Sequence, residues 1–245
     1  MKNLIFLFAW LLPCFAQATV SVPQAKVVAS AYRAKAFTAD YVVFRNGKNL
    51  GTANIKFSDI GNGRWELRTH TIGTGIAAIA GVEIHERSLI RWNEGKPETI
   101  DYGFSQKTGW KDKQRSITVN AQNNTIASQD KEKTYSLKYQ PGVLDRHAIT
   151  IAIMQDLSQG KRGDLIYPVA DRDELNTQLY RLIGNEKMQT ALGILNAVKV
   201  QRIRENANGK TTTLWLASDK QFIPLRIEQI EGNGDTTEMR IETQR

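Results

Sequence analysis

The sequence predicts a mainly β protein: an antiparallel barrel or strongly curved half-barrel of about a dozen strands with one or two covering helices. Three observations lead to this prediction. Apolar residues mostly recur at every second position downstream of the N-terminal segment. Turn-forming pairs such as Asn46-Gly47 separate these runs at hairpin spacing. Finally, Trp215 points one way from its strand and Leu214 and Leu216 the other, so both faces need cover.

The expected strands follow one another with short connections, as in a meander. In the N-terminal half they are two runs within 39–57, then 64–72, 82–92, 100–104, 116–120, 125–129 and 134–139. In the C-terminal third they are 197–205, 210–217, 223–231 and 236–243. Because most of these strands are joined by hairpin turns, the neighbours are expected to pair antiparallel.

Two segments have the composition or spacing of helices. The first is Ala-rich and covers 23–36. The second covers 146–159, with Asp145 as its N-cap and Gly160 as its stop. Apolar residues surround much of the second helix, which therefore needs cover on more than one side. We expect this helix to close the concave face of the sheet.

The N-terminus reads as an export signal over residues 1–18, followed by a single exported β-rich domain over 19–245. Lys2 precedes an apolar run of about a dozen residues, which is too short to span a bilayer. Ala16 and Ala18 provide the small residues of a cleavage site after Ala18. The alternative is a lipoprotein anchored at Cys14, although Pro13 departs from the small residue required there. The cleavable signal predicts a periplasmic location.

The chain is basic, with 33 Lys and Arg against 25 Asp and Glu. Outside the cytoplasm this bias favours anionic envelope surfaces over nucleic acid. Basic residues are concentrated in one segment, where Trp110 lies among Lys107, Lys111, Lys113 and Arg115. The segment is interpreted either as a site for anionic head groups or as an ordinary β-edge protected by lysines.

No motif for catalysis, cofactor binding or metal binding is found. The three histidines, His70, His85 and His147, have no metal-ligand spacing along the chain, and the only cysteine lies in the export signal. His85 and Ser88 lie on opposite sides of a predicted strand, which argues against a shared site. Phosphate loops, nucleophile elbows and dinucleotide fingerprints are absent. We therefore predict no catalytic residue, no cofactor and no metal site.

The segment 73–84, GTGIAAIAGVEI, is too long for a tight hairpin and carries no charge in its first nine residues. Ile76 and Ile79 lie three residues apart, as on one side of a single helical turn. Two interpretations stay open. The segment is either a plug at the end of a closed core or the lid of an open pocket.

Four stretches resemble the exported bacterial proteins of the domain-of-unknown-function 3108 family. They are VEIHERSLIRW, PGVLDRHAITIAIMQDL, YPVADRDEL and TTTLWLASDKQFIPLRIEQIEGNGDTTEMRI, and the resemblance runs from about Thr38 to Ile241. It implies an envelope-associated β protein without an assigned reaction. A more distant similarity, of fold alone, links the predicted sheet and covering helix to periplasmic lipoprotein carriers.

The favoured function is a binding or carrier module for an apolar or amphipathic envelope molecule. Ile76, Ile79 and Val82 would form the mouth of its site, with Trp92 and Trp215 inside and Trp110 near a head group. The alternatives are a docking module for an envelope protein and a hydrolase without a recognisable motif.

Overall fold

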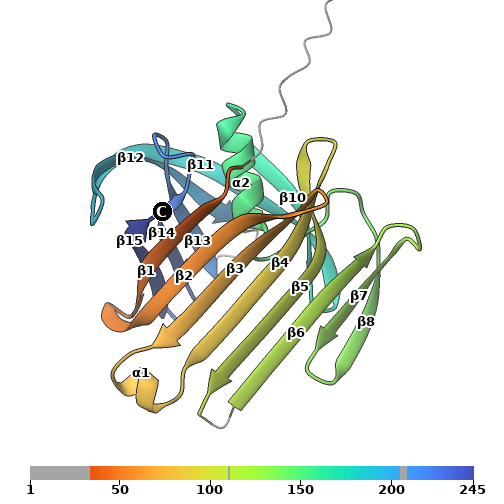
Figure 1. Ribbon diagram of the computed structural model, residues 1–245, viewed down its shortest axis with the longest axis horizontal. Coiled ribbons are helices and arrows are strands. Elements are labelled where there is room, and N and C mark those ends of the chain that lie inside the picture. The colour runs from red at the N-terminus through yellow and green to blue at the C-terminus, as the bar shows by residue number, and fades with distance from the viewer. Residues whose placement is uncertain (1–33, 110, 205–208) are drawn as a thin grey trace, which may run out of the picture. The chain divides into compact units, whose positions relative to one another are not determined.

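The computed structural model describes residues 34–109, 111–204 and 209–245, all within the unit Ala31–Arg245. These residues form one 15-stranded sheet with two helices (Figure 1). The strands are β1 Phe37–Arg45, β2 Lys48–Gly61, β3 Arg64–Gly73, β4 Glu83–Asn93, β5 Lys96–Thr108, β6 Lys111–Asn120, β7 Thr125–Asp130, β8 Lys133–Lys138, β9 Leu144–Asp145, β10 Asp164–Asp171, β11 Glu174–Thr190, β12 Gly193–Ile203, β13 Thr211–Ala217, β14 Pro224–Ile230 and β15 Thr236–Gln244.

The sheet is an antiparallel meander whose two halves are joined by its first and last strands. Its order is β8-β7-β6-β5-β4-β3-β2-β1-β15-β14-β13-β12-β11-β10-β9, and only the short β9 pairs parallel, with β10. The sheet is strongly curved and ends at β8 and β9 (Figure 1). The predicted mainly β class is confirmed, and the strongly curved, open form describes the sheet better than a closed barrel.

Helix α2, Ile149–Ser158, lies within the curve of the sheet (Figure 1). Ile151, Ile153 and Leu157 are at most 1% exposed and belong to the main core with side chains of both halves of the sheet. The carboxylate of Asp145 accepts hydrogen bonds from the backbone N–H groups of His147 and Ala148, in the turn before α2. The N-cap of α2 is Ala148, so the predicted N-cap Asp145 lies three residues too early. Gly160, the predicted stop, has a φ of 80°.

A smaller core joins regions that lie far apart in the sheet order. Tyr102, Ile117 and Ile126 from β5, β6 and β7 pack with Val143 and Ala170 from the β9–β10 region. The end strands of the sheet are therefore linked through side chains and not through a continuous ladder of hydrogen bonds.

The predicted hairpins are confirmed where the structure describes them. Asn46 and Gly47 have φ values of 48° and 73°, as the turn between β1 and β2 requires. The export signal and most of the helix predicted over 23–36 lie outside the described residues, and residues 34–36 are not helical. Within the described ranges, no helix has the length and apolar character needed to cross a membrane.

Candidate functional site

The two faces of the sheet can be distinguished along β4, because successive side chains of a strand point to opposite faces. Ser88 is fully buried on the inner face, which packs against α2. His85 lies on the outer face and is paired with His70 of β3. The prediction that His85 and Ser88 face opposite sides is therefore confirmed.

A buried polar cluster on the inner face ties the start of α2 to β4 and β5. The fully buried carboxylate of Asp145 accepts hydrogen bonds from Ser88 Oγ and Thr99 Oγ1, each at 2.8 Å. His147 Nδ1 lies 3.0 Å from Ser88 Oγ, and its Nε2 lies 2.9 Å from Thr69 Oγ1. Burial raises the pKa of Asp145, although these hydrogen bonds oppose the shift.

The residue types of this cluster are those of a hydrolytic triad, but their arrangement differs from one. In a triad the base accepts the proton of the serine, and the acid orients the base. Here Ser88 donates to Asp145 directly and has no exposed surface from which to reach a substrate. The cluster is therefore a support for α2.

A second buried carboxylate, Glu98, fixes the chain segment that leads to α2. It has no exposed surface and accepts hydrogen bonds from Arg91 Nε at 3.0 Å and from the Gly142 N–H at 2.8 Å. Tyr139 donates to the same carboxylate. Burial alone would raise the pKa of Glu98, but the Gly142 amide and Arg91 outweigh it and hold the pKa below its usual range.

Helix α1, Ile76–Ile79, is the helical turn expected in the segment 73–84, and it projects two isoleucines outward. Ile76 is 85% exposed and Ile79 is 88% exposed, whereas Ala77 between them is buried. The plug interpretation is therefore wrong, because neither isoleucine enters the core. Nor does α1 line the pocket described below on the outer face.

Backbone hydrogen bonds hold the segment around α1 to β2 and to the connection after β5. The Thr74 N–H donates to Leu50 O at 2.9 Å, and the Gly109 N–H donates to Ala80 O at 2.6 Å. Close packing of Gly73 fixes it further, since a Cβ there would lie 2.8 Å from the backbone of Ala77. We call α1 with its exposed Ile76 and Ile79 the apolar platform.

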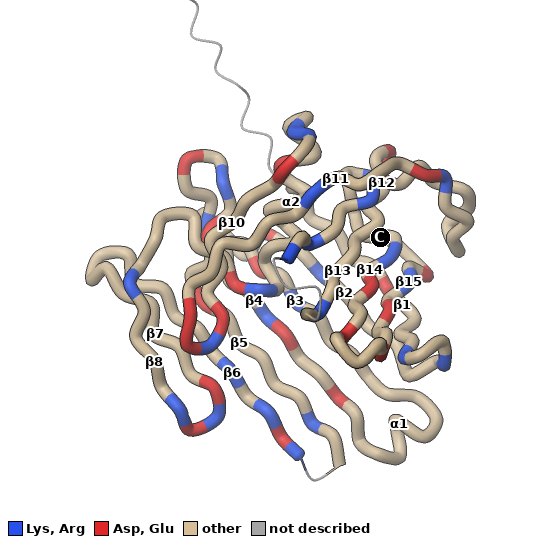
Figure 2. Tube along the Cα trace, turned by 180° about the vertical axis from the view of Figure 1, so that it is seen from behind, with Lys and Arg blue, Asp and Glu red and all other residues tan. Residues whose placement is uncertain are grey.

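The predicted basic segment lies beside the apolar platform, at the connection between β5 and β6. Figures 1 and 2 show α1 and this connection at the same end of the sheet. Lys107, Lys111 and Lys113 are exposed, and Lys107 lies opposite Glu83 in the register. Strand β6 pairs with β5 from Lys111 onward but with β7 only from Arg115 onward, so Lys111 and Lys113 pair on one side only among the described residues, and the β-edge interpretation stays open. Trp110 lies outside the described residues.

Arg115 lies on the same face of β6 as Lys111 and Lys113, but it is less exposed than they are. It lies opposite Phe104, with its guanidinium carbon 5.8 Å from the centre of that ring. Its Nε is 3.1 Å from Asp130 Oδ1, and both side chains are mostly buried. Arg115 therefore helps to hold β6 to β7.

The two tryptophans predicted to share an interior site lie on opposite faces. Trp92 packs on the inner face in an edge-on contact with Trp65, at 6.4 Å between ring centres. Trp215 is buried on the outer face between Lys199 and Arg226, at 4.9 and 4.5 Å from its ring centre. The prediction that both faces of its strand are covered is confirmed, but the proposed common site is wrong.

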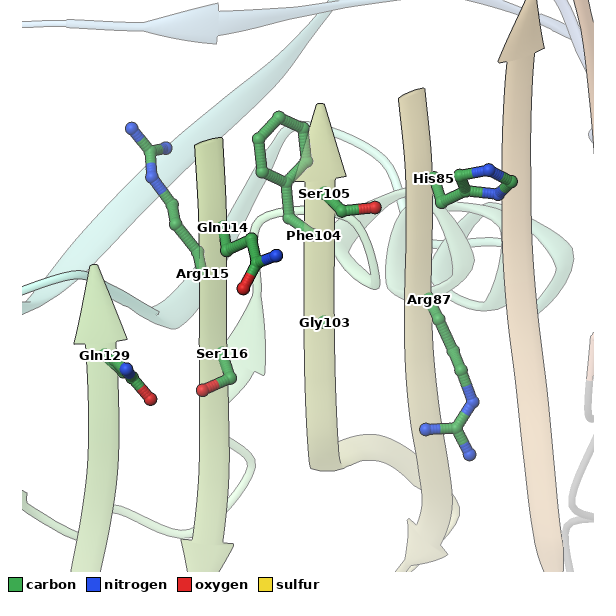
Figure 3. A pocket seen from close by; sticks show the side chains of 9 residues that line it. All are labelled: His85, Arg87, Gly103, Phe104, Ser105, Gln114, Arg115, Ser116 and Gln129. Atoms are coloured by element: carbon green, nitrogen blue, oxygen red, sulfur yellow. The ribbon is translucent and has the colours of Figure 1, made fainter. Parts of the chain in front are cut away.

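A pocket of about 350 Å³, lined mostly by residues of polar type, lies over Gly103 on the outer face (Figure 3). Because glycine has no side chain, the neighbouring strands leave a hollow above it. The labelled residues around it are His85, Arg87, Gly103, Phe104, Ser105, Gln114, Arg115, Ser116 and Gln129. The ring of His85 points away from Gly103 and toward β3 (Figure 3).

The exposed histidines of β3 and β4 meet on this outer face. The rings of His70 and His85 stack at 4.1 Å between centres, with an angle of 12° between their planes. Hydrogen bonds from His85 and His70 hold the pKa of Glu83 below its usual range. The spacing of residues along one segment did not predict this cluster, because its members come from two strands and are brought together by the register between them.

One solved structure of similar architecture supports the fold. A β-barrel-like protein from Brucella abortus with the domain of unknown function DUF1849 is 10% identical, with a TM-score of 0.56, 87% of this chain covered and 98% of that one. MucB is 13% identical with a TM-score of 0.37, covering 89% of this chain and 55% of its own.

MucB in its complex with MucA from Pseudomonas aeruginosa is 14% identical, with a TM-score of 0.38, 89% of this chain covered and 54% of that one. This chain therefore spans about half the length of the MucB chains. A search of curated proteins found no match. The family model described as protein of unknown function DUF3108 matches residues 36–241, and the chain belongs to that family.

Proposed function

We propose that the protein is a binding module of the bacterial cell envelope that docks onto anionic lipid through the apolar platform and the neighbouring lysines. The observation that carries the proposal is the exposure of Ile76 and Ile79 at 85% and 88% on a turn held by backbone hydrogen bonds. Large apolar side chains held outward in this way favour contact with a partner or a membrane. The predicted export signal supports a location in the envelope.

Charge complementarity supports anionic lipid as the partner. Lys107, Lys111 and Lys113 are exposed at the same end of the sheet as α1. Each lysine near an anionic membrane contributes about 1 kcal/mol of attraction, and isoleucines add to it when their side chains enter the interface. The combination of apolar tips and nearby cations is typical of proteins that bind at a membrane surface.

The geometry does not favour the carrier model, in which an acyl chain would lie between the sheet and a helix. In that position the side chains of α2 already fill the core, and Ile151 and Ile153 have no exposed surface. An amphipathic ligand would instead be bound at the end of the sheet that carries the apolar platform.

Vesicle sedimentation tests the proposal with protein purified from the envelope of a bacterium that exports it. We expect binding to vesicles of phosphatidylcholine with phosphatidylglycerol, and weaker binding to phosphatidylcholine alone. The double variant Ile76→Ser/Ile79→Ser should bind at least about tenfold more weakly, because about 1.4 kcal/mol of lost apolar contact suffices for that factor. Lys107→Gln should weaken binding to the anionic vesicles only, by up to about fivefold.

A matched control uses two exposed isoleucines outside the platform. Ile166 and Ile194 are 62% and 67% exposed, and their replacement by serine should leave vesicle binding unchanged. Equal loss in both double variants, or no vesicle binding by the wild-type protein, would contradict the proposal. In the second case, crosslinking from the platform to a single envelope protein would favour the docking alternative.

A further inference from the structure

Three side chains with metal-binding atoms converge on the outer face of the β3–β4 hairpin. His70 lies directly opposite His85, and Glu83 precedes His85 by two residues on the same face. His70 Nε2 lies 3.1 Å from Glu83 Oε1, and His85 Nε2 lies 2.8 Å from the same oxygen. All three ligand atoms lie within 4.8 Å of one another.

The side chains are open to solvent, so that an ion can enter and keep bound water. They are 39%, 40% and 54% exposed for His70, Glu83 and His85. The imidazole rings stack almost in parallel, and both place Nε2 beside the same oxygen of Glu83.

We propose that His70, Glu83 and His85 bind one divalent transition-metal ion of the zinc class, with the remaining coordination position open to solvent. Two imidazole nitrogens and one carboxylate form a donor set suited to zinc and poorly suited to calcium or magnesium, which prefer oxygen. Metal–ligand bonds of about 2.0–2.2 Å in a tetrahedral site place neighbouring donor atoms about 3.3 Å apart. The two separations between Glu83 and the histidines, 2.8 and 3.1 Å, need an expansion of only a few tenths of an ångström to reach that value, and the third pair of ligand atoms lies within 4.8 Å.

The site is independent of lipid docking, and one neighbouring residue distinguishes the two proposals. Lys107 lies opposite Glu83 in the register between β4 and β5, so its positive charge opposes a bound cation. Lys107→Gln should therefore leave zinc binding unchanged or strengthen it, while the same variant weakens binding to anionic vesicles. A general loss of the fold would weaken both kinds of binding, so this variant separates the two proposals from an effect on the fold.

Zinc titration of the protein without a polyhistidine tag, against a chromophoric zinc indicator, tests the site. We expect saturation at one zinc ion per chain. His70→Ala and His85→Ala should each weaken binding at least about tenfold, because a three-ligand site that loses one imidazole keeps only two donors. Glu83→Gln should also weaken it, while Glu94→Gln, an exposed acidic control at the other end of β4, should bind as the wild type does.

A spectroscopic readout separates specific binding from general effects on the protein. Zinc should shift the ring-proton resonances of His70 and His85 and leave those of His147, which lies in the inner-face cluster, unchanged. Absence of stoichiometric binding, or equal affinity in the wild type and in His85→Ala, would overturn the proposal.

Discussion

Helices α1 and α2 are both short and rich in isoleucine, yet the exposure of their isoleucines is opposite. Ile151 and Ile153 of α2 have no exposed surface, whereas Ile76 and Ile79 of α1 are almost fully exposed. The difference comes from position. Helix α2 lies inside the curve of the sheet, while α1 lies at the end of the β3–β4 hairpin (Figure 1).

The two helices also differ in what fixes them. The turn before α2 is held by the buried carboxylate of Asp145, and the segment before that by Glu98. Helix α1 is held by backbone hydrogen bonds and by the packing of Gly73 and Ala77. This contrast indicates that α2 contributes to the core, whereas α1 holds its two isoleucines outside it.

The largest expected effect on stability comes from shortening a buried side chain of α2. Ile153→Ala should lower the free energy of unfolding by about 2–5 kcal/mol, because it removes buried methyl groups and leaves a cavity. Urea unfolding followed by tryptophan fluorescence measures this change. The matched variant Ile79→Ala on α1 should change stability by less than about 0.5 kcal/mol. Similar losses in the two variants would remove the distinction between the helices.

Acid should weaken the polar anchoring of the segment that leads to α2. The folded-state pKa of Glu98 lies below its unfolded value of about 4.3, so the ionised carboxylate stabilises the fold above that pH. The contribution is lost as the pH falls through the folded-state pKa. Glu98→Gln should therefore cost about 1–3 kcal/mol at pH 7 and progressively less below pH 4.

Comparing urea unfolding of the wild type and of Glu98→Gln across this pH range isolates the effect, because other titrating groups are common to both proteins. A difference in unfolding free energy that stays constant from pH 7 to pH 3 would show that the charge of Glu98 makes no contribution. It would also leave Asp145 as the main polar anchor of α2.

Local patterns predicted most of the fold. Alternation and turn residues identified the hairpins, and the apolar residues around 146–159 predicted a helix covered on more than one side, as α2 is. Such local patterns could not predict whether Trp92 and Trp215 lie on the same face of the sheet. Alternation gives the face of each strand relative to its neighbours, whereas the relation between distant strands depends on the whole run of pairings from β4 to β13.

The histidine cluster shows the same limit at short range. His70 and His85 are separated by the segment that contains α1, so no spacing rule joins them. Their pairing follows from the register of β3 and β4, which places Arg68 opposite Arg87 and Ile72 opposite Glu83 in the same ladder. A register predicted from the alternation of both strands would have brought the two histidines together.

The smallest expected effect on stability belongs to the residues most important for the proposed function. Ile76→Ser/Ile79→Ser should change the free energy of unfolding by less than about 0.5 kcal/mol, because the side chains make little contact with the fold. Gly73→Ala is the contrasting variant in the same segment, since its Cβ would collide with Ala77 and destabilise the platform. Urea unfolding of both variants measures the difference. If the double serine variant lost several kcal/mol, the isoleucines would belong to the core, and weaker vesicle binding could no longer be attributed to the exposed surface.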